Sequence, residues 1–206
     1  MSRKIQVGVI DYGGGNIRSL IQALESLGTS PVLVTSPEGM ASLTHLFFPG
    51  QGAFGDCMTK LRNLDLVDPI VEWIQADKPF FGICIGYQLL FESSEESPGI
   101  DGLSILEGKV IRFVEEGFKV PHMGWNDLIL NRDHPVLSGV SSGDHAYFVH
   151  SYHIRPRNET LITGTCNYGQ NFAAALHQGN IHAVQFHPEK SQKDGLRILQ
   201  NFLTFS

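Results

Sequence analysis

The sequence has few charged residues and no long apolar run. Charged side chains make up 17% of its 206 residues, against about 25% in an average globular chain, and the net charge is −6. No basic run is longer than Arg3 and Lys4, so the chain lacks the basic patch that binding to nucleic-acid phosphates requires. Its 42% hydrophobic content excludes a disordered chain, and no apolar stretch reaches the roughly 18 residues of a membrane span.

Cysteine is also scarce. Cys57, Cys84 and Cys166 form no C-x-x-C pair, and an odd number cannot all be joined in disulfides. Free thiols are typical of a reducing compartment, so we expect a cytoplasmic protein. The apolar run after Lys4 is too short for a signal peptide and meets Asp11.

Several binding motifs are missing. The segment from Gly102 to Gly108 and Lys109 has five intervening residues where a phosphate-binding P-loop has four, and no G-x-G-x-x-G follows a predicted strand. There is no H-E-x-x-H, and His150 and His153, three apart on one expected strand, should face opposite sides of it. We therefore expect neither a cofactor nor a metal.

The pattern of apolar residues predicts the fold. In the first half, strand-like runs cover residues 5–10, 31–35, 45–48 and 80–83, and helical patterns cover 17–27, after the N-cap candidate Asn16, and about 66–76. This alternation predicts a parallel sheet with right-handed crossovers.

The second half is richer in strands. Runs separated by Gly, Asn and Pro turns predict an antiparallel or mixed extension of the same sheet, at residues 103–113, 127–130, 145–154, 161–166, 172–176 and 181–186. Ser191 is the expected cap of a last helix. We expect an α/β fold, with a mostly parallel central sheet flanked by helices and an antiparallel extension, forming a single domain over residues 1–206.

The strongest chemical motif is Gly82-Ile83-Cys84-Ile85-Gly86, between a predicted strand and a helical run over residues 88–91. The Gly-x-nucleophile-x-Gly pattern is that of a nucleophile elbow, a sharp strand-to-helix turn whose flanking glycines let the chain pass close to itself. The turn places a thiol at a helix N-terminus, which favours the thiolate, and directs the next backbone N–H, of Ile85, at a developing oxyanion. An inert buried cysteine is the alternative.

Two further motifs supply what a cysteine nucleophile needs. His187-Pro188-Glu189 directly follows the predicted strand at 181–186, where His187 could serve as base and Glu189 could orient it. Pro49-Gly50-Gln51-Gly52 follows another strand, and its glycines allow peptide N–H groups to turn inward as an oxyanion hole requires. Taken singly, each motif could equally be an ordinary surface turn.

The motifs follow one another along the chain as Pro49-Gly50-x-Gly52, Gly82-x-Cys84-x-Gly86-x-Gln88 and His187-Pro188-Glu189. In this order they resemble the class I (triad) glutamine amidotransferases over nearly the whole chain. Four segments are similar to the glutaminase subunits of imidazole glycerol phosphate synthases within that family: residues 11–16 (DYGGGN), 121–126 (PHMGWN), 147–152 (YFVHSY) and 187–191 (HPEKS). The resemblance implies a heterodimer with a synthase (cyclase) subunit and glutamine as the substrate.

The resemblance also implies roles for individual residues. Cys84 would attack the glutamine amide, His187 would act as base and acid, and Glu189 would orient it. Backbone N–H groups of Ile85, Gly50 and Gln51 would hold the oxyanion, although Gln51 stands where many relatives carry an aliphatic residue. Four residues would hold the ends of the substrate: Gly52, Gln88, Ser151 and Tyr152.

Ammonia released into water becomes mostly ammonium, which is not nucleophilic, so a glutaminase without an acceptor site needs a partner. We expect Asn16, Met123, Trp125 and Asn126 to line the docking face, because Met and Trp often anchor interfaces. Pro121 and Gly124 predict that this segment is a loop.

Three functions fit the sequence. The first is a glutaminase that supplies a cyclase of histidine biosynthesis. The second is a paralogous glutaminase that supplies amidation in surface-polysaccharide synthesis, which genomic neighbourhood would distinguish. The third is a non-catalytic regulatory subunit, against which the complete set Cys84, His187 and Glu189 argues.

Overall fold

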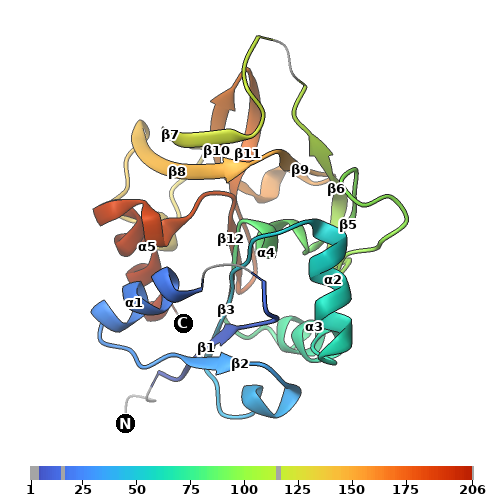
Figure 1. The fold of residues 1–206 in the computed structure, drawn as a ribbon. Coiled ribbons are helices and arrows are strands. Elements are labelled where there is room, and N and C mark those ends of the chain that lie inside the picture. Colours follow the sequence, from blue (N-terminus) through green and yellow to red (C-terminus); the bar gives the residue numbers. More distant parts are fainter. Residues whose placement is uncertain (1–4, 15–16, 115–116, 206) are drawn as a thin grey trace.

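A parallel sheet forms the centre of the molecule (Figure 1). The computed structural model describes residues 5–14, 17–114 and 117–205. Five parallel strands lie in the order β2-β1-β3-β4-β12, and they span Val32–Val34, Val7–Ile10, His45–Phe48, Phe80–Ile83 and Ile181–Val184. Every residue of β1, β3, β4 and β12 is buried, which explains their nearly continuous apolar sequences.

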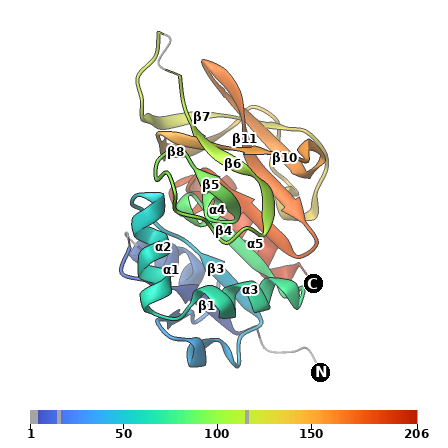
Figure 2. The same ribbon diagram turned by 90° about the vertical axis from the view of Figure 1, so that its right-hand side faces the viewer.

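Helices cover both faces of this sheet. On one face, α1 (Arg18–Ser26) and α5 (Gln192–Thr204) bury Leu24 and Phe202 against the strands. On the other face, α2 (Phe54–Asn63) and α3 (Val67–Gln75) bury Phe54 and Trp73, and Figure 2 turns these two helices to the front. None of the helices in the described residues is both long and apolar enough to cross a membrane.

The antiparallel extension continues the same sheet beyond β12, as the sequence predicts. Its strands lie in the order β11-β10-β7-β8 and span Gln170–Gln178, Ile162–Tyr168, His122–Leu130 and Asp144–His150. A separate three-stranded sheet of β5 (Phe91–Ser94), β6 (Leu106–Arg112) and β9 (Tyr152–Pro156) was not expected. Short helical turns complete the described chain: η1 (Pro37–Met40), α4 (Ile85–Gln88), η2 (Pro135–Leu137), η3 (Glu159–Leu161) and η4 (Pro188–Lys190).

Several local predictions were wrong. The run expected at residues 145–154 is divided at Ser151 into β8 and β9, so His150 and His153 do not face opposite sides of one strand, and both rings pack on Phe113. The helical run expected over residues 88–91 ends earlier, since α4 stops at Gln88 and Phe91 begins β5.

Two turn predictions also need correction. The segment around Gly124 is part of β7 and not a loop, because Gly124 is accommodated in the strand at a φ of 132°. Ser191 stands at the N-cap position of α5 but makes no side-chain cap bond. Its hydroxyl instead accepts from the Tyr147 N–H at 3.0 Å and donates to the His187 carbonyl at 2.7 Å, which ties η4 to β8.

Candidate active site

Cys84 lies at the sharp turn between β4 and α4. Its backbone has φ 55° and ψ −106°, a left-handed conformation that costs energy in a residue with a side chain and is typical of functional sites. A methyl group at Gly86 would overlap the Phe48 carbonyl, so glycine is required there for the turn to pack on β3. The elbow geometry predicted from the sequence is therefore present, although the single turn of α4 offers only a small helix dipole.

His187 and Glu189 form a buried pair directly after β12. Nδ1 of His187 lies 2.8 Å from Oε1 of Glu189, and the two side chains are 3% and 6% exposed. The His187 backbone N–H donates to the Tyr147 carbonyl at 2.9 Å. The carboxylate thus fixes the proton on Nδ1 and leaves Nε2, which is buried and has no hydrogen-bond partner among the described residues, free to exchange a proton with a neighbour.

The nucleophile and the base meet because their strands are neighbours. β4 pairs in parallel with β12 in the register Ile83↔Val184, so Cys84 and His187 both follow the carboxyl ends of adjacent strands. Burial alone would lower the pKa of His187, but the adjacent Cys84 thiol and the Glu189 carboxylate together hold it well above its usual value. The site therefore favours an imidazolium beside the sulfur.

A cavity of about 360 Å³ opens over the Cys84 side chain. The four residues expected to hold the substrate, Gly52, Gln88, Ser151 and Tyr152, all line it, as do Gln51 and Ile85. Both amide protons of Gln88 are engaged, at 3.0 Å from the Tyr152 carbonyl and 3.1 Å from Oε1 of Gln185. Only the carbonyl oxygen of Gln88 is thus left for a ligand, which it can bind as an acceptor.

The glycine loop after β3 lies between the cavity and the base. Gln51 and Gly52 face the cavity, and Gly52 adopts a φ of 123° that suits glycine. Gly50 instead borders a second, very small cavity beside His187 and Glu189. A methyl group at Gly50 would overlap the Tyr12 hydroxyl and the Ile85 side chain, so the loop packs tightly against these two residues.

The amino-acid sequence matches a known family over nearly its whole length. The sequence profile described as "Glutamine amidotransferase class-I" matches residues 8–205. The chain belongs to the class-I glutamine amidotransferase family.

Among the most similar relatives of this amidotransferase are proteins named "Imidazole glycerol phosphate synthase subunit HisH". The one from Syntrophotalea carbinolica is 46% identical over 200 residues (94% of this chain and 97% of that protein), and the one from Aquifex aeolicus is 47% identical over 195 residues (94% of each). The Arabidopsis thaliana protein named "Imidazole glycerol phosphate synthase hisHF, chloroplastic" is 45% identical over 96% of this chain, which covers 34% of that longer protein.

Solved structures share the amidotransferase fold. A structure described as "Crystal structure of glutamine amidotransferase" superposes with a TM-score of 0.76 at 24% identity, covering 96% of this chain and 97% of that one. The structure of PurLQS from Thermotoga maritima gives a TM-score of 0.77 at 19% identity, with 98% and 99% covered. At these identities the comparison establishes the architecture of the sheet and its helices.

Three further residues of the amidotransferase belong to the site but were not assigned to it from the sequence. Glu96 lines the cavity, and its carboxylate accepts from the Phe54 N–H at 2.7 Å. Gln185 donates to the Cys84 sulfur at 3.7 Å. His150 also lines the cavity, and its Nε2 lies 3.1 Å from Nδ1 of His122. Glu96 and Gln185 lie outside the quoted motifs and reach the site by the packing of distant segments, whereas His150 lies within the segment 147–152 that the sequence singles out.

Three of the four expected docking residues of the amidotransferase lie on β7. Met123 and Trp125 are large apolar side chains that are 63% and 46% exposed, at alternate positions and therefore on one face of the strand. The Asn126 amide is directed inward, 3.2 Å from Nε2 of His122 and 2.9 Å from the Asn167 carbonyl. Asn16, the fourth expected docking residue, lies outside the described residues.

Proposed function

We propose that this chain is the glutaminase subunit of an imidazole glycerol phosphate synthase. It hydrolyses glutamine to glutamate and ammonia, and a cyclase subunit uses the ammonia in a step of histidine biosynthesis. The observation that carries the proposal is the placement of Cys84 beside the buried pair of His187 and Glu189, at the floor of a cavity of amino-acid size. All of residues 1–206 serve this activity as one domain.

The reaction follows from the positions of these groups. His187 takes the thiol proton, and the Cys84 sulfur attacks the side-chain carbonyl carbon of glutamine. The N–H groups of Ile85, Gly50 and Gln51 stabilise the negative oxygen, and His187 returns the proton to the leaving nitrogen, which departs as ammonia. Water, deprotonated by His187, then hydrolyses the thioester to glutamate and restores the thiol. Glu189 stabilises the imidazolium throughout.

The cavity fits the two charged ends of glutamine. Gly52, Ser151 and Tyr152 line the wall around the sulfur and hold the α-carboxylate end of the substrate. Glu96 supplies a carboxylate, and Gln88 offers its carbonyl oxygen, so these two acceptors hold the α-ammonium group. No cofactor is needed for any step.

A synthase partner is the natural acceptor of the ammonia. Bacterial relatives at 44–47% identity carry the word "subunit" in their names. In the plant protein, the matching region is one part of a longer chain. Met123 and Trp125 offer an exposed apolar pair of the kind that anchors an interface. We assign Asn126 and Asn16 to the same docking face, although Asn16 lies outside the described residues. These names favour the histidine pathway over polysaccharide amidation. The free thiols fit a cytoplasmic location.

The test is a measurement of glutamate release by the chain alone, with its cyclase subunit, and with the cyclase and its substrate. We expect weak activity alone and strong stimulation in the complex. The Cys84→Ala variant should lose glutamine-dependent turnover, while the complex still uses added ammonium salts. Glutamine hydrolysis by Cys84→Ala would disprove the assignment of the nucleophile. A wild-type complex that turns over with ammonium but never with glutamine would instead support a regulatory subunit.

A further inference from the structure

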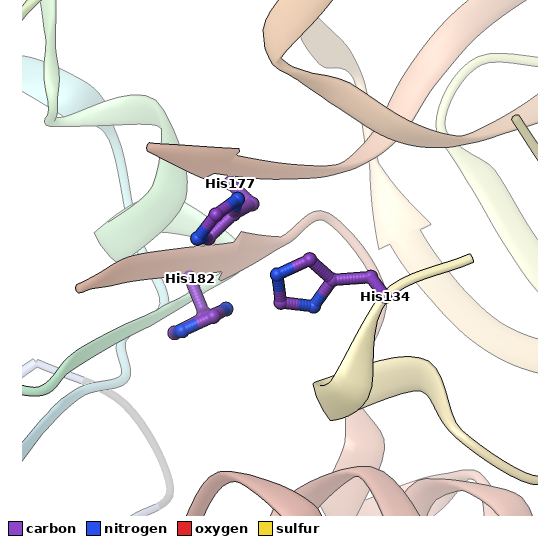
Figure 3. Close-up of side chains that lie close together, drawn as sticks. All are labelled: His134, His177 and His182. Carbon is purple, nitrogen blue, oxygen red and sulfur yellow. The ribbon is translucent and has the colours of Figure 1, made fainter. Parts of the chain in front are cut away.

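Three histidines from separate elements gather away from the thiol site. His134 directly precedes η2, His177 lies near the end of β11, and His182 lies on β12 (Figure 3). The ring of His134 faces the gap between the other two rings. One nitrogen of each ring lies within 4.8 Å of the others, and no other such group of His, Cys, Asp or Glu side chains occurs in the described part of the chain.

The hydrogen bonds of the three rings show which nitrogens are available. Nε2 of His177 lies 2.7 Å from the Gly179 carbonyl, to which it donates, so its Nδ1 carries a free lone pair. A backbone carbonyl on the far nitrogen is the usual outer partner of a metal-binding histidine. His182 is only 2% exposed, and its Nε2 has no hydrogen-bond partner among the described residues. A buried nitrogen without a partner is costly unless a bound group satisfies it.

His134 has to change its hydrogen bonding in order to bind an ion. Its Nδ1 accepts from the Val136 N–H at 3.2 Å, which leaves Nε2 as the nitrogen that is not engaged in the turn. Binding a cation through Nε2 requires the ring proton to stand on Nδ1, so this long hydrogen bond is given up. His134 and His177 are partly exposed and lie at the ends of their elements, so they can move inward, whereas His182 is fixed in the sheet.

The surroundings enclose the space between the three rings. His182 is 2% exposed, and Val136 and Leu176 line the same space. A cavity of about 10 Å³, lined by the three histidines and by Thr163 among others, has room for about one small ion or water. Arg132 is the nearby cation, and its exposed position lets solvent screen its repulsion.

We propose that His134, His177 and His182 form a binding site for a divalent transition-metal ion of the zinc type, with water as the fourth ligand. Three imidazoles are a common donor set for Zn²⁺, and imidazole also suits Ni²⁺ and Co²⁺. Zinc–nitrogen bonds of about 2.0–2.1 Å place tetrahedral ligands about 3.3 Å apart, so the rings close inward on binding. The bound ion joins the turn at η2 to β11 and to β12, the strand that leads to His187.

The test uses the metal alone on the full-length chain. Cys84→Ala serves as the parent, so that the catalytic thiol cannot bind the ion, and metal is first removed with a chelator. Titration calorimetry with Zn²⁺ should show one ion per chain, and replacing all three histidines by Gln should weaken binding at least tenfold. The matched control is His145→Gln, because this histidine of β8 is 62% exposed and lies outside the group of three.

Two further measurements keep the result decisive if the triple variant folds poorly. At a hundredfold excess of Zn²⁺ over Kd, the parent chain should gain about 5–10 °C in Tm, and His145→Gln should gain the same. Crystals grown with Zn²⁺ should show an anomalous-scattering peak among the three rings. Absence of binding, binding unchanged in the triple variant, or a peak bounded by other residues would each overturn the proposal.

Discussion

Nδ1 of His187 lies 2.8 Å from Oε1 of Glu189, and the two side chains lie almost entirely inside the protein. A carboxylate in this position does two things, because it fixes the ring tautomer and it favours the charged imidazole. The high pKa of His187 depends on both Glu189 and Cys84. The two contributions can be separated by substitution.

The Glu189→Gln variant should keep the orientation of His187 but lose the charge. Because a nearby carboxylate favours the protonated ring, its removal should lower the pKa of His187, and the alkaline limb of kcat/KM should move to lower pH. We expect a loss of about 10²–10⁴ in kcat/KM. The measurement is the pH profile of glutamate release in the complex, with ammonium-dependent turnover as the control. An unchanged profile would show that Glu189 does not set the charge of His187.

The Glu96→Gln variant should weaken substrate binding more than catalysis. The carboxylate faces the cavity and can pair with the α-ammonium group of glutamine, so its neutralisation should raise KM by about tenfold or more with a smaller change in kcat. Glu107→Gln is the matched control, since this glutamate of β6 is exposed and pairs with Arg157, which directly follows β9. The measurement is the steady-state kinetics of both variants. An equal KM for glutamine in the two would show that Glu96 does not bind the substrate.

The Gly50→Ala variant should destabilise the protein. The added methyl group overlaps the Tyr12 hydroxyl and the Ile85 side chain, both buried, and such overpacking typically costs about 1–3 kcal/mol. Adding Tyr12→Phe removes the overlapping hydroxyl and should recover part of the loss. Urea unfolding of the wild type, the two single variants and the double variant measures this coupling. Strict additivity would mean that the two groups do not meet.

Buried histidines should make the protein sensitive to mild acid. Burial lowers the folded-state pKa of His150 to about 3 and that of His182 to about 2, against about 6.5 unfolded. The unfolded chain therefore binds more protons below pH 6.5, so the free energy of unfolding falls as pH falls, by up to about 1.4 kcal/mol per pH unit for each histidine.

Urea midpoints between pH 7 and pH 5, taken with a chelator present, check this slope. His182→Gln should flatten the slope by the share of one histidine, because glutamine does not titrate in this range. Equal slopes in the wild type and His182→Gln would contradict the assignment of a depressed pKa to His182.

The Trp125→Ala variant should weaken association with the cyclase subunit. Tryptophan at the centre of an interface commonly contributes about 2 kcal/mol or more, which is roughly a thirtyfold change in Kd. Leu33→Ala is the control, because Leu33 is 47% exposed but lies on β2, at the opposite end of the sheet order from β7 and β8. Equal affinities for both variants would place the docking face elsewhere.

The parts of the site that could be predicted from the sequence are those whose signals are local. β4 and β12 are buried on both faces, so their apolar runs are nearly continuous. Cys84 directly follows β4, and His187 stands three residues after the end of β12. The glycines around Cys84 follow from close approaches of the backbone, of Gly86 to the Phe48 carbonyl and of Gly82 to the Gly86 carbonyl. These features depend on a few neighbouring residues, and the prediction of the elbow was confirmed in its geometry.

Other parts depend on distant contacts or carry misleading local signals. The helix α2 was not predicted, although its buried residues Phe54, Cys57, Met58 and Leu61 stand at helical spacing. Gly124 reads as a loop residue but lies in β7, where the pairing with β8 overrides its local preference. Glu96 and Gln185 reach the cavity only through tertiary packing, and no motif in their own segments marks them.

The pairing of β4 with β12 means that the reactive centre is assembled late. Gln185, which donates to the Cys84 sulfur, stands 101 positions further along the chain, and His187 follows it. A ribosome therefore releases Cys84 long before the imidazole that activates it, and contacts between such distant segments form slowly. The growing chain carries an ordinary thiol, and enhanced alkylation of Cys84 would report that the last strand has entered the sheet.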